Sequence, residues 1–199
     1  SLPLLNCKKI ILISSTSVYG RVKKKYLTEK NTIAEKISNY AKSKLMMEKL
    51  LIEHCKKNKV NFLILRLPAI VGKNSKNNFI SNLFKTIYEG KDVIISNPNL
   101  KFNNLVHVDD VAKIIENYLK LKDKNFIFNL STTYPIKLIN ICKIIIKKFK
   151  NKNRIIFINK KTKGFRIQLN KYLLREFDIM TTKKTLELMC KEALLERYK

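Results

Sequence analysis

Two short apolar runs on either side of an amphipathic segment are the feature that most constrains the fold of this chain. The runs at residues 8–14 (KKIILIS) and 61–67 (NFLILRL) lack polar–apolar alternation, which is typical of strands buried on both faces of a parallel sheet. Residues 40–57 between them have the apolar periodicity of a helix. The apolar positions of this helix include Leu45, Met46, Leu50 and Leu51. Together the three segments predict a βαβ unit with parallel strands and a right-handed crossover.

The remaining sequence continues the alternation of strands and helices. Further helices are expected over residues 79–88, 111–121, 136–148, 170–177 and 182–198. Further strands are expected over residues 93–96, 126–130 and 154–158, and connections over residues 22–39 and 97–104. The chain is therefore predicted to have an α/β fold.

Hydroxyl side chains end the first predicted strand, and a tyrosine–lysine pair opens the helix after it. The apolar run ends in Ser14 and Ser15, and Tyr40 and Lys44 are four residues apart, so they share one face of the helix. Both side chains can therefore point toward one ligand. The alternative for Ser15 is a strand-end hydroxyl that satisfies local backbone groups. For the pair, it is a partly buried tyrosine beside a solvated lysine.

The tyrosine–lysine spacing has little weight by itself, because the chain is rich in lysine. Tyr19, Tyr26 and Tyr118 are also followed by a lysine at the same spacing. Tyr118, however, lies late in a helix with apolar periodicity, where packing explains it, and Tyr26 lies in a lysine-rich connection. Context therefore selects Tyr40.

The net charge of +27 raises the question of a nucleic-acid partner. The lysines are spread through every segment, and no helix-turn-helix or zinc-finger pattern accompanies them. We interpret the charge as a solvated surface, part of which attracts a pyrophosphate group, and nucleic-acid binding is disfavoured. Because no apolar run approaches the length of a membrane span, no membrane partner is expected.

The cysteines and histidines give no sign of a metal site. Cys7, Cys55, Cys142 and Cys190 are scattered without a C-x-x-C pair, and the chain has 2 histidines. This pattern disfavours structural metal and a disulfide framework and is typical of a reducing compartment. A cytoplasmic protein without a metal is expected.

Five segments occur in an order and at spacings that together are specific. They are S-S-x-x-V-Y-G at 14–20, Y-x-x-x-K at 40–44, L-R-x-P-x-x-x-G at 65–72, H-V-x-D-V-A at 107–112 and F-N-L-S at 128–131. In this combination the chain resembles the extended short-chain dehydrogenase/reductase family, in its NAD-dependent epimerase/dehydratase branch. The resemblance implies the C-terminal half of a Rossmann-type parallel sheet plus a small α/β substrate domain.

The resemblance also implies a division of the chain. Residues 1–72 and about 104–131 correspond to the remainder of the Rossmann NAD-binding domain. Residues from about 73 to 103 and from 132 to 199 correspond to the substrate-binding domain.

The resemblance assigns Ser15, Tyr40 and Lys44 to catalysis. A free tyrosine, with a pKa of about 10, is a poor base at neutral pH. The charges of Lys44 and of a cationic nicotinamide favour the phenolate, which suits Tyr40 to general acid–base catalysis. The hydroxyl of Ser15 is expected to hold the reacting oxygen beside Tyr40.

The implied cofactor is NAD or NADP, and the implied substrate is a nucleotide-diphosphate sugar. Tyr40, Lys44 and Pro68 are expected at the nicotinamide end of the cofactor, with Lys44 on its ribose. Ser15 and Asn78 are expected at the substrate, with Asn78 at the diphosphate. A helix N-cap explains Asn78 equally well.

The sequence departs from the family at two places. The glycine-rich phosphate loop is missing, so we expect that this chain lacks the N-terminal cofactor half and is inactive by itself. An arginine that binds the diphosphate in several members is replaced by Asn103. Lys161, Lys163 and Arg166 are candidates to supply the lost charge.

The leading hypothesis is an NAD(P)-dependent nucleotide-sugar epimerase or reductase, which forms a homodimer at full length. Thr16 and Ser17 stand where 4,6-dehydratases of the family carry Asp-Glu, so dehydration is disfavoured. A dehydrogenase or ketoreductase acting on a non-sugar substrate remains an alternative, as does a non-catalytic basic binding module of the same fold. His107 and Asp110 are interpreted as structural residues at a helix start.

Overall fold

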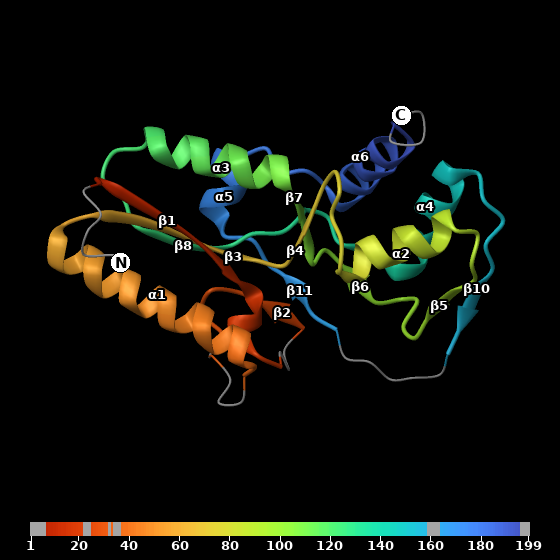
Figure 1. Cartoon of the computed structure of the whole chain (residues 1–199), viewed down its shortest axis with the longest axis horizontal. Coiled ribbons are helices and arrows are strands. Elements are labelled where there is room, and N and C mark those ends of the chain that lie inside the picture. The colour runs from red at the N-terminus through yellow and green to blue at the C-terminus, as the bar shows by residue number, and fades with distance from the viewer. Residues whose placement is uncertain (1–6, 22–24, 32, 34–36, 159–163, 196–199) are drawn as a thin grey trace.

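A three-stranded parallel sheet forms the centre of the molecule (Figure 1). The computed structural model describes residues 7–21, 25–31, 33, 37–158 and 164–195, and the structural statements below refer to these residues. The strand order is β1-β3-β8, with bounds β1 Lys9–Ser15, β3 Asn61–Leu67 and β8 Phe126–Asn129. Helix α1 (Asn39–Asn58) connects β1 to β3. The predicted βαβ unit and α/β class are therefore confirmed.

Helices cover both faces of this sheet. Figure 1 shows α1 on one face and α3 (Val108–Lys120) and α5 (Lys171–Glu176) on the other. On the α1 face, Leu51 and Cys55 pack against Ile64 of β3. On the opposite face, apolar side chains of α3 and α5 pack against β3 and β8. Because the strands are covered on both sides, they need no polar alternation.

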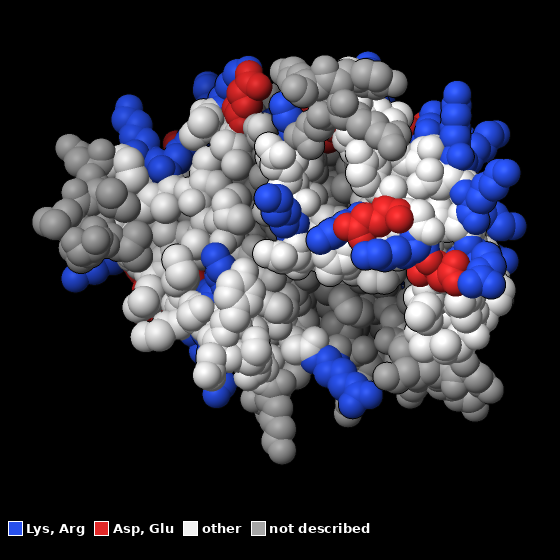
Figure 2. All heavy atoms as spheres, turned by 45° about the vertical axis from the view of Figure 1, so that its right-hand side comes forward, with Lys and Arg blue, Asp and Glu red and all other residues white. Residues whose placement is uncertain are grey.

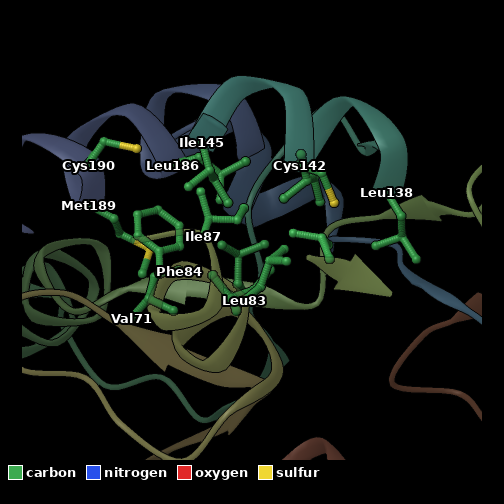
Figure 3. Packing of buried hydrophobic residues seen from close by; sticks show 14 of the residues in the cluster. Val71, Leu83, Phe84, Ile87, Leu138, Cys142, Ile145, Leu186, Met189 and Cys190 are labelled. Carbon is green, nitrogen blue, oxygen red and sulfur yellow. The ribbon is translucent and has the colours of Figure 1, made fainter. Parts of the chain in front are cut away.

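A second core lies beside the sheet. Its helices are α2 (Phe79–Tyr88), α4 (Leu138–Phe149) and α6 (Thr182–Leu195), and its parallel strands are β5 (Val93–Ile95) and β10 (Ile155–Phe157). Figure 3 shows Phe84 and Ile87 of α2 packed with Ile145 of α4 and Met189 of α6. The predicted assignment of these residues to a separate substrate domain stays a prediction.

Short strands connect the two regions, and the sequence pattern did not reveal them. They are β2 (Tyr26–Leu27), β4 (Ala69–Val71), β6 (Lys101–Phe102), β7 (Leu105–His107), β9 (Ile136–Lys137) and β11 (Arg166–Ile167). β4 pairs with β7 and β2 with β11 in parallel, whereas β6 and β9 are antiparallel. Two or three residues are too short to display a period. The predicted connections 22–39 and 97–104 therefore each contain a strand.

The surface charge is dispersed. Figure 2 shows Lys and Arg side chains in several places on the visible face, with some acidic side chains beside them. Among the described residues, Arg154 pairs with Asp92 and Lys91 pairs with Glu89, each at 2.6 Å. Exposed pairs of this kind contribute little to stability. Within the described residues, no helix is long and apolar enough to cross a membrane.

The outer edge of β1 should promote self-association of the chain. In the described part of the chain β1 pairs only with β3, and Ile10 to Ile13 are only partly buried. An apolar edge strand with unpaired backbone groups templates association. We expect the 199-residue chain by itself to form soluble oligomers or aggregates despite its charge. Light scattering during size-exclusion chromatography measures this, and a monodisperse monomer would contradict it.

Candidate active site

The ends of two neighbouring strands bring the predicted site residues to one edge of the sheet. Ser15, the last residue of β1, is the register partner of Leu67, the last residue of β3. Pro68 follows Leu67 directly, before β4 begins. Ser15 and Pro68 therefore lie at the carboxyl ends of adjacent parallel strands, where open α/β sheets bind their ligands.

The Ser15 hydroxyl oxygen accepts two hydrogen bonds from Ser17, which fix its orientation. Ser15 is the N-cap of the short 3₁₀ helix η2 (Thr16–Tyr19) and accepts hydrogen bonds from the backbone N–H of Ser17 at 3.1 Å and from its Oγ at 2.9 Å. A serine oxygen has two lone pairs and one hydrogen, so these bonds leave the hydrogen for an outside acceptor. Ser15 can therefore satisfy local donor groups, as the strand-end alternative expects, and still donate to a ligand, as the catalytic prediction requires.

Helix α1 presents Tyr40 and Lys44 near the same edge. The helix starts at Asn39, with Ser38 as its N-cap, so Tyr40 lies in the first turn and is 57% exposed. The Lys44 ammonium donates to the backbone carbonyl of Ile13 at 2.9 Å and lies 5.8 Å from the centroid of the Tyr40 ring. Lys44 therefore ties α1 to β1 two residues before Ser15, while the phenol remains accessible.

Asn78 is the N-cap of α2. Its side chain accepts from the backbone N–H of Ser81 at 2.9 Å, and the Ser81 hydroxyl accepts from the backbone N–H of Asn78 at 3.1 Å. This capping box confirms the structural interpretation of Asn78. Contact with a substrate diphosphate stays a prediction.

Asn103 has a structural function in the described residues. It is buried, donates to the carbonyl groups of Ile167 at 2.8 Å and Thr132 at 3.1 Å, and accepts from the Ile167 N–H at 3.0 Å. The amide therefore joins β11 to the loop after β8. Of the residues proposed to replace the family's arginine charge, Arg166 stacks 4.4 Å from the Tyr26 ring centroid. Lys161 and Lys163 lie outside the described residues.

His107 and Asp110 pack at the start of α3, as the structural interpretation predicts. His107 is the N-cap of α3 and accepts from the backbone N–H of Asp109 at 3.2 Å. The Asp110 carboxylate accepts from the backbone N–H of Met180 at 3.0 Å. Burial raises the pKa of Asp110, while this hydrogen bond acts in the opposite direction.

A buried ionic network behind the site was not predicted from the sequence. Arg66 of β3 donates to the Glu48 carboxylate of α1, with distances of 3.1 Å from Nε to Oε1 and 2.6 Å from Nη2 to Oε2. The Ser14 hydroxyl also donates to Glu48. Arg66 further donates to the Tyr19 hydroxyl at 2.7 Å, which donates to Asn129 at 3.0 Å. The only signal in the sequence was the place of Glu48 on the helix face that holds Lys44, one turn later.

Electrostatics keep this network ionic. Burial by itself lowers the pKa of Arg66, but its hydrogen bonds to Glu48 and the charge attraction of Glu48 raise it above the usual range. Burial raises the pKa of Tyr19, although Arg66 acts against this. Tyr19 is therefore a neutral hydrogen-bonding phenol at neutral pH, and Arg66 is a fixed cation.

Comparisons with known proteins show which family the chain matches. A model of the NAD dependent epimerase/dehydratase family matches residues 2–131. A protein of Methanocaldococcus jannaschii described as uncharacterized protein MJ1055 is 27% identical over 158 residues, which are 78% of this chain and 45% of that protein.

Solved structures share the fold. The UDP-glucuronic acid 4-epimerase from Bacillus cereus in complex with NAD is 22% identical, with a TM-score of 0.77 over 96% of this chain and 62% of that one. The UDP-N-acetylglucosamine 4-epimerase from Methanobrevibacter ruminantium M1 is 18% identical, with a TM-score of 0.78 over 96% of this chain and 64% of that one. This chain thus spans about half to two thirds of the length of these proteins.

The parallel sheet and the covering helices define a Rossmann-like α/β protein. Because the family model covers well over half of the chain, the chain belongs to the NAD-dependent epimerase/dehydratase family.

The capping geometry of Asn78 allows its two predicted roles to be separated. Asn78→Ala removes the cap and should cost about 1 kcal/mol of stability, whereas Asn78→Ser keeps a capping oxygen and should cost much less. Thermal unfolding of both variants measures this difference. If Asn78 also contacts a diphosphate, Asn78→Ser should weaken substrate binding while stability is retained; equal stability of all three proteins would contradict the cap.

Proposed function

We propose that this chain provides the acid–base and substrate-binding part of an NAD(P)-dependent nucleotide-sugar epimerase or reductase. The observation that carries the proposal is the hydrogen bond from Lys44 to the Ile13 carbonyl. This bond brings the helix face that holds Tyr40 to the strand that ends in Ser15. In this proposal a base, a cation and a hydroxyl donor act together where β1 and β3 end.

The residues present fit a nicotinamide cofactor at this edge. The Lys44 ammonium has three donor hydrogens and uses one on Ile13, so others remain for ribose hydroxyls. Pro68, at the end of β3, offers an apolar surface without an N–H to the nicotinamide ring. In this proposal Tyr40, Lys44 and Pro68 hold the nicotinamide end of NAD or NADP.

The reaction moves one hydride and one proton. A bound nicotinamide cofactor would supply hydride transfer at the sugar carbon. The Tyr40 phenolate accepts the proton of the sugar hydroxyl, so the carbon is oxidised to a ketone and the charges balance. Ser15 donates its hydrogen to the same oxygen and holds it in place. Return of the proton from Tyr40 would complete an epimerisation if the hydride were given back to the opposite face of the ketone. It would complete a reduction if the substrate were a ketone and the cofactor were bound in its reduced form.

A basic cavity supports a diphosphate-bearing substrate. It has a volume of about 410 Å³, and its lining includes Lys25, Lys101 and Arg166. Three cations around one polar cavity favour an anionic group. Two proteins of similar fold are in complex with nucleotide sugars, one with UDP-glucuronic acid and NAD and one with UDP-N-acetylmuramic acid, which supports the same substrate class.

Further features belong to the proposal for the complete natural protein. Thr16 and Ser17 of η2 lack carboxylates, which favours epimerisation or reduction over dehydration. Met46, Met47 and Leu50 are exposed on the outside of α1, and this apolar surface suits a second copy in a homodimer. We propose a cytoplasmic location, in line with four free cysteines.

Replacing Tyr40 tests the proposed function. Tyr40→Phe removes the ionisable oxygen from an exposed ring, so it should lower kcat about 100-fold or more with little effect on stability. The measurement is turnover of nucleotide sugars by the full-length natural protein loaded with cofactor. Tyr118→Phe is the matched control, since the buried Tyr118 hydroxyl donates only to the Lys124 carbonyl and its loss should leave kcat nearly unchanged. Undiminished turnover by Tyr40→Phe would contradict the assignment.

The chain by itself should bind NAD weakly. Tyr40, Lys44 and Pro68 contact only the nicotinamide end in this proposal, whereas a glycine loop at a helix N-terminus holds the pyrophosphate in Rossmann folds. Hydrogen bonds to charged groups contribute about 1.5–3 kcal/mol each, and each 1.4 kcal/mol is about a tenfold change in affinity. We therefore expect a Kd in the millimolar range or weaker by isothermal titration calorimetry. Micromolar binding would show that other residues of this chain form a cofactor site.

A further inference from the structure

The buried network crosses the sheet as a single row. Ser14, Arg66 and Asn129 are register partners on the adjacent strands β1, β3 and β8. This row lies immediately before the row of Ser15 and Leu67, where the strands end. The network is therefore directly beneath the proposed catalytic edge, on the face that packs against α1.

The guanidinium of Arg66 links α1 and η2, the two helices at which the proposed catalytic residues lie. Through Glu48, Arg66 holds α1, which carries Tyr40 and Lys44. Through Tyr19, it holds the end of η2, whose N-cap is Ser15. Glu48 and Arg66 are 2% and 8% exposed, so solvent does not weaken these contacts.

Helix α1 is attached to β1 at two consecutive residues. Lys44 donates to the Ile13 carbonyl, and Glu48, one turn later, accepts from Ser14. A helix rises about 6 Å in four residues, so two attachments at this spacing fix both its height and its rotation on the strand. Tyr40 lies one turn before Lys44 on the same face. The position of Tyr40 along β1, relative to Ser15, therefore depends on both attachments.

We propose that the Glu48–Arg66 pair is a positioning element that holds Tyr40 and Lys44 in catalytic register with Ser15. This inference rests on the proposed function of that site. Stability alone does not account for the pair, because well-packed apolar residues often replace a buried ion pair without loss of stability. A bidentate ionic contact adds directional geometry that apolar packing lacks.

The test separates positioning from folding. Glu48→Gln leaves Arg66 buried without a counter-charge and can fail to fold, so the decisive variant is the double replacement Glu48→Gln/Arg66→Met, which removes both charges. Glu53→Gln is the control, because Glu53 is exposed on the same helix. All variants are made in the full-length natural protein, and kcat and KM are measured per folded, cofactor-loaded site.

The proposal predicts a specific kinetic pattern. The double variant should keep the wild-type melting temperature within a few degrees but lose about 10- to 100-fold in kcat, as small misplacements of catalytic groups do. Its KM should change by less than about threefold, and Glu53→Gln should match the wild type. Wild-type kcat in the folded double variant would overturn the proposal.

A second readout does not require turnover. Hydrogen–deuterium exchange of the double variant should be about tenfold faster in residues 14–20 and 39–45 and unchanged in residues 138–149 of α4. If the wild type turns over no nucleotide sugar, the proposed function fails, and this exchange pattern still decides whether the pair positions the two segments. Unchanged exchange in both segments, or an equal rise throughout the chain, would overturn the positioning role.

Discussion

The register between β1 and β3 is the constraint on which the site depends. Ser15 pairs with Leu67, so both strands end at the same height, and Pro68 follows beside Ser15. A shift of one residue would turn Ser15 to the other face of the sheet and move the partly buried Ile11 and Ile13 off the core that they pack against. Hydrophobic burial on both faces thus fixes the position of polar side chains that contribute little to burial themselves.

Polar contacts then position α1 on the paired strands β1 and β3. Apolar packing of Leu51 and Cys55 against Ile64 attaches the far half of the helix to the sheet, but hydrophobic burial is non-directional. The bond from Lys44 to the Ile13 carbonyl and the bidentate pair with Arg66 are directional, and both lie in the half nearer the site. The far half of α1 therefore contributes stability through apolar packing, and the half nearer the site sets the positions of Tyr40 and Lys44.

The sequence predicted the long elements well, because a helix of ten or more residues displays a period and an apolar run of seven residues marks a buried strand. β3 and α2 begin and end where the pattern indicated, and the Asn78 cap and the buried Tyr118 were identified from local signals. The short connecting strands β2, β4, β6, β7, β9 and β11 and the partners of Asn103 were not predictable, since they arise from contacts between segments distant in sequence. The same applies to α1: the apolar residues Met46 and Leu50 are exposed, whereas the charged Glu48 is buried against Arg66. Periodicity ranks residues by polarity and cannot reveal a counter-ion on another strand.

The central claim is that Tyr40, Lys44 and Ser15 act on one sugar hydroxyl at the carboxyl edge of β1. A crystal structure of the full-length natural protein with NAD and a nucleotide sugar tests it most directly. The account predicts the Tyr40 phenol and the Ser15 hydroxyl within hydrogen-bond distance of the same sugar oxygen, with the Lys44 ammonium on the nicotinamide ribose. A sugar bound away from this edge, with its reacting hydroxyl against other side chains, would contradict the account.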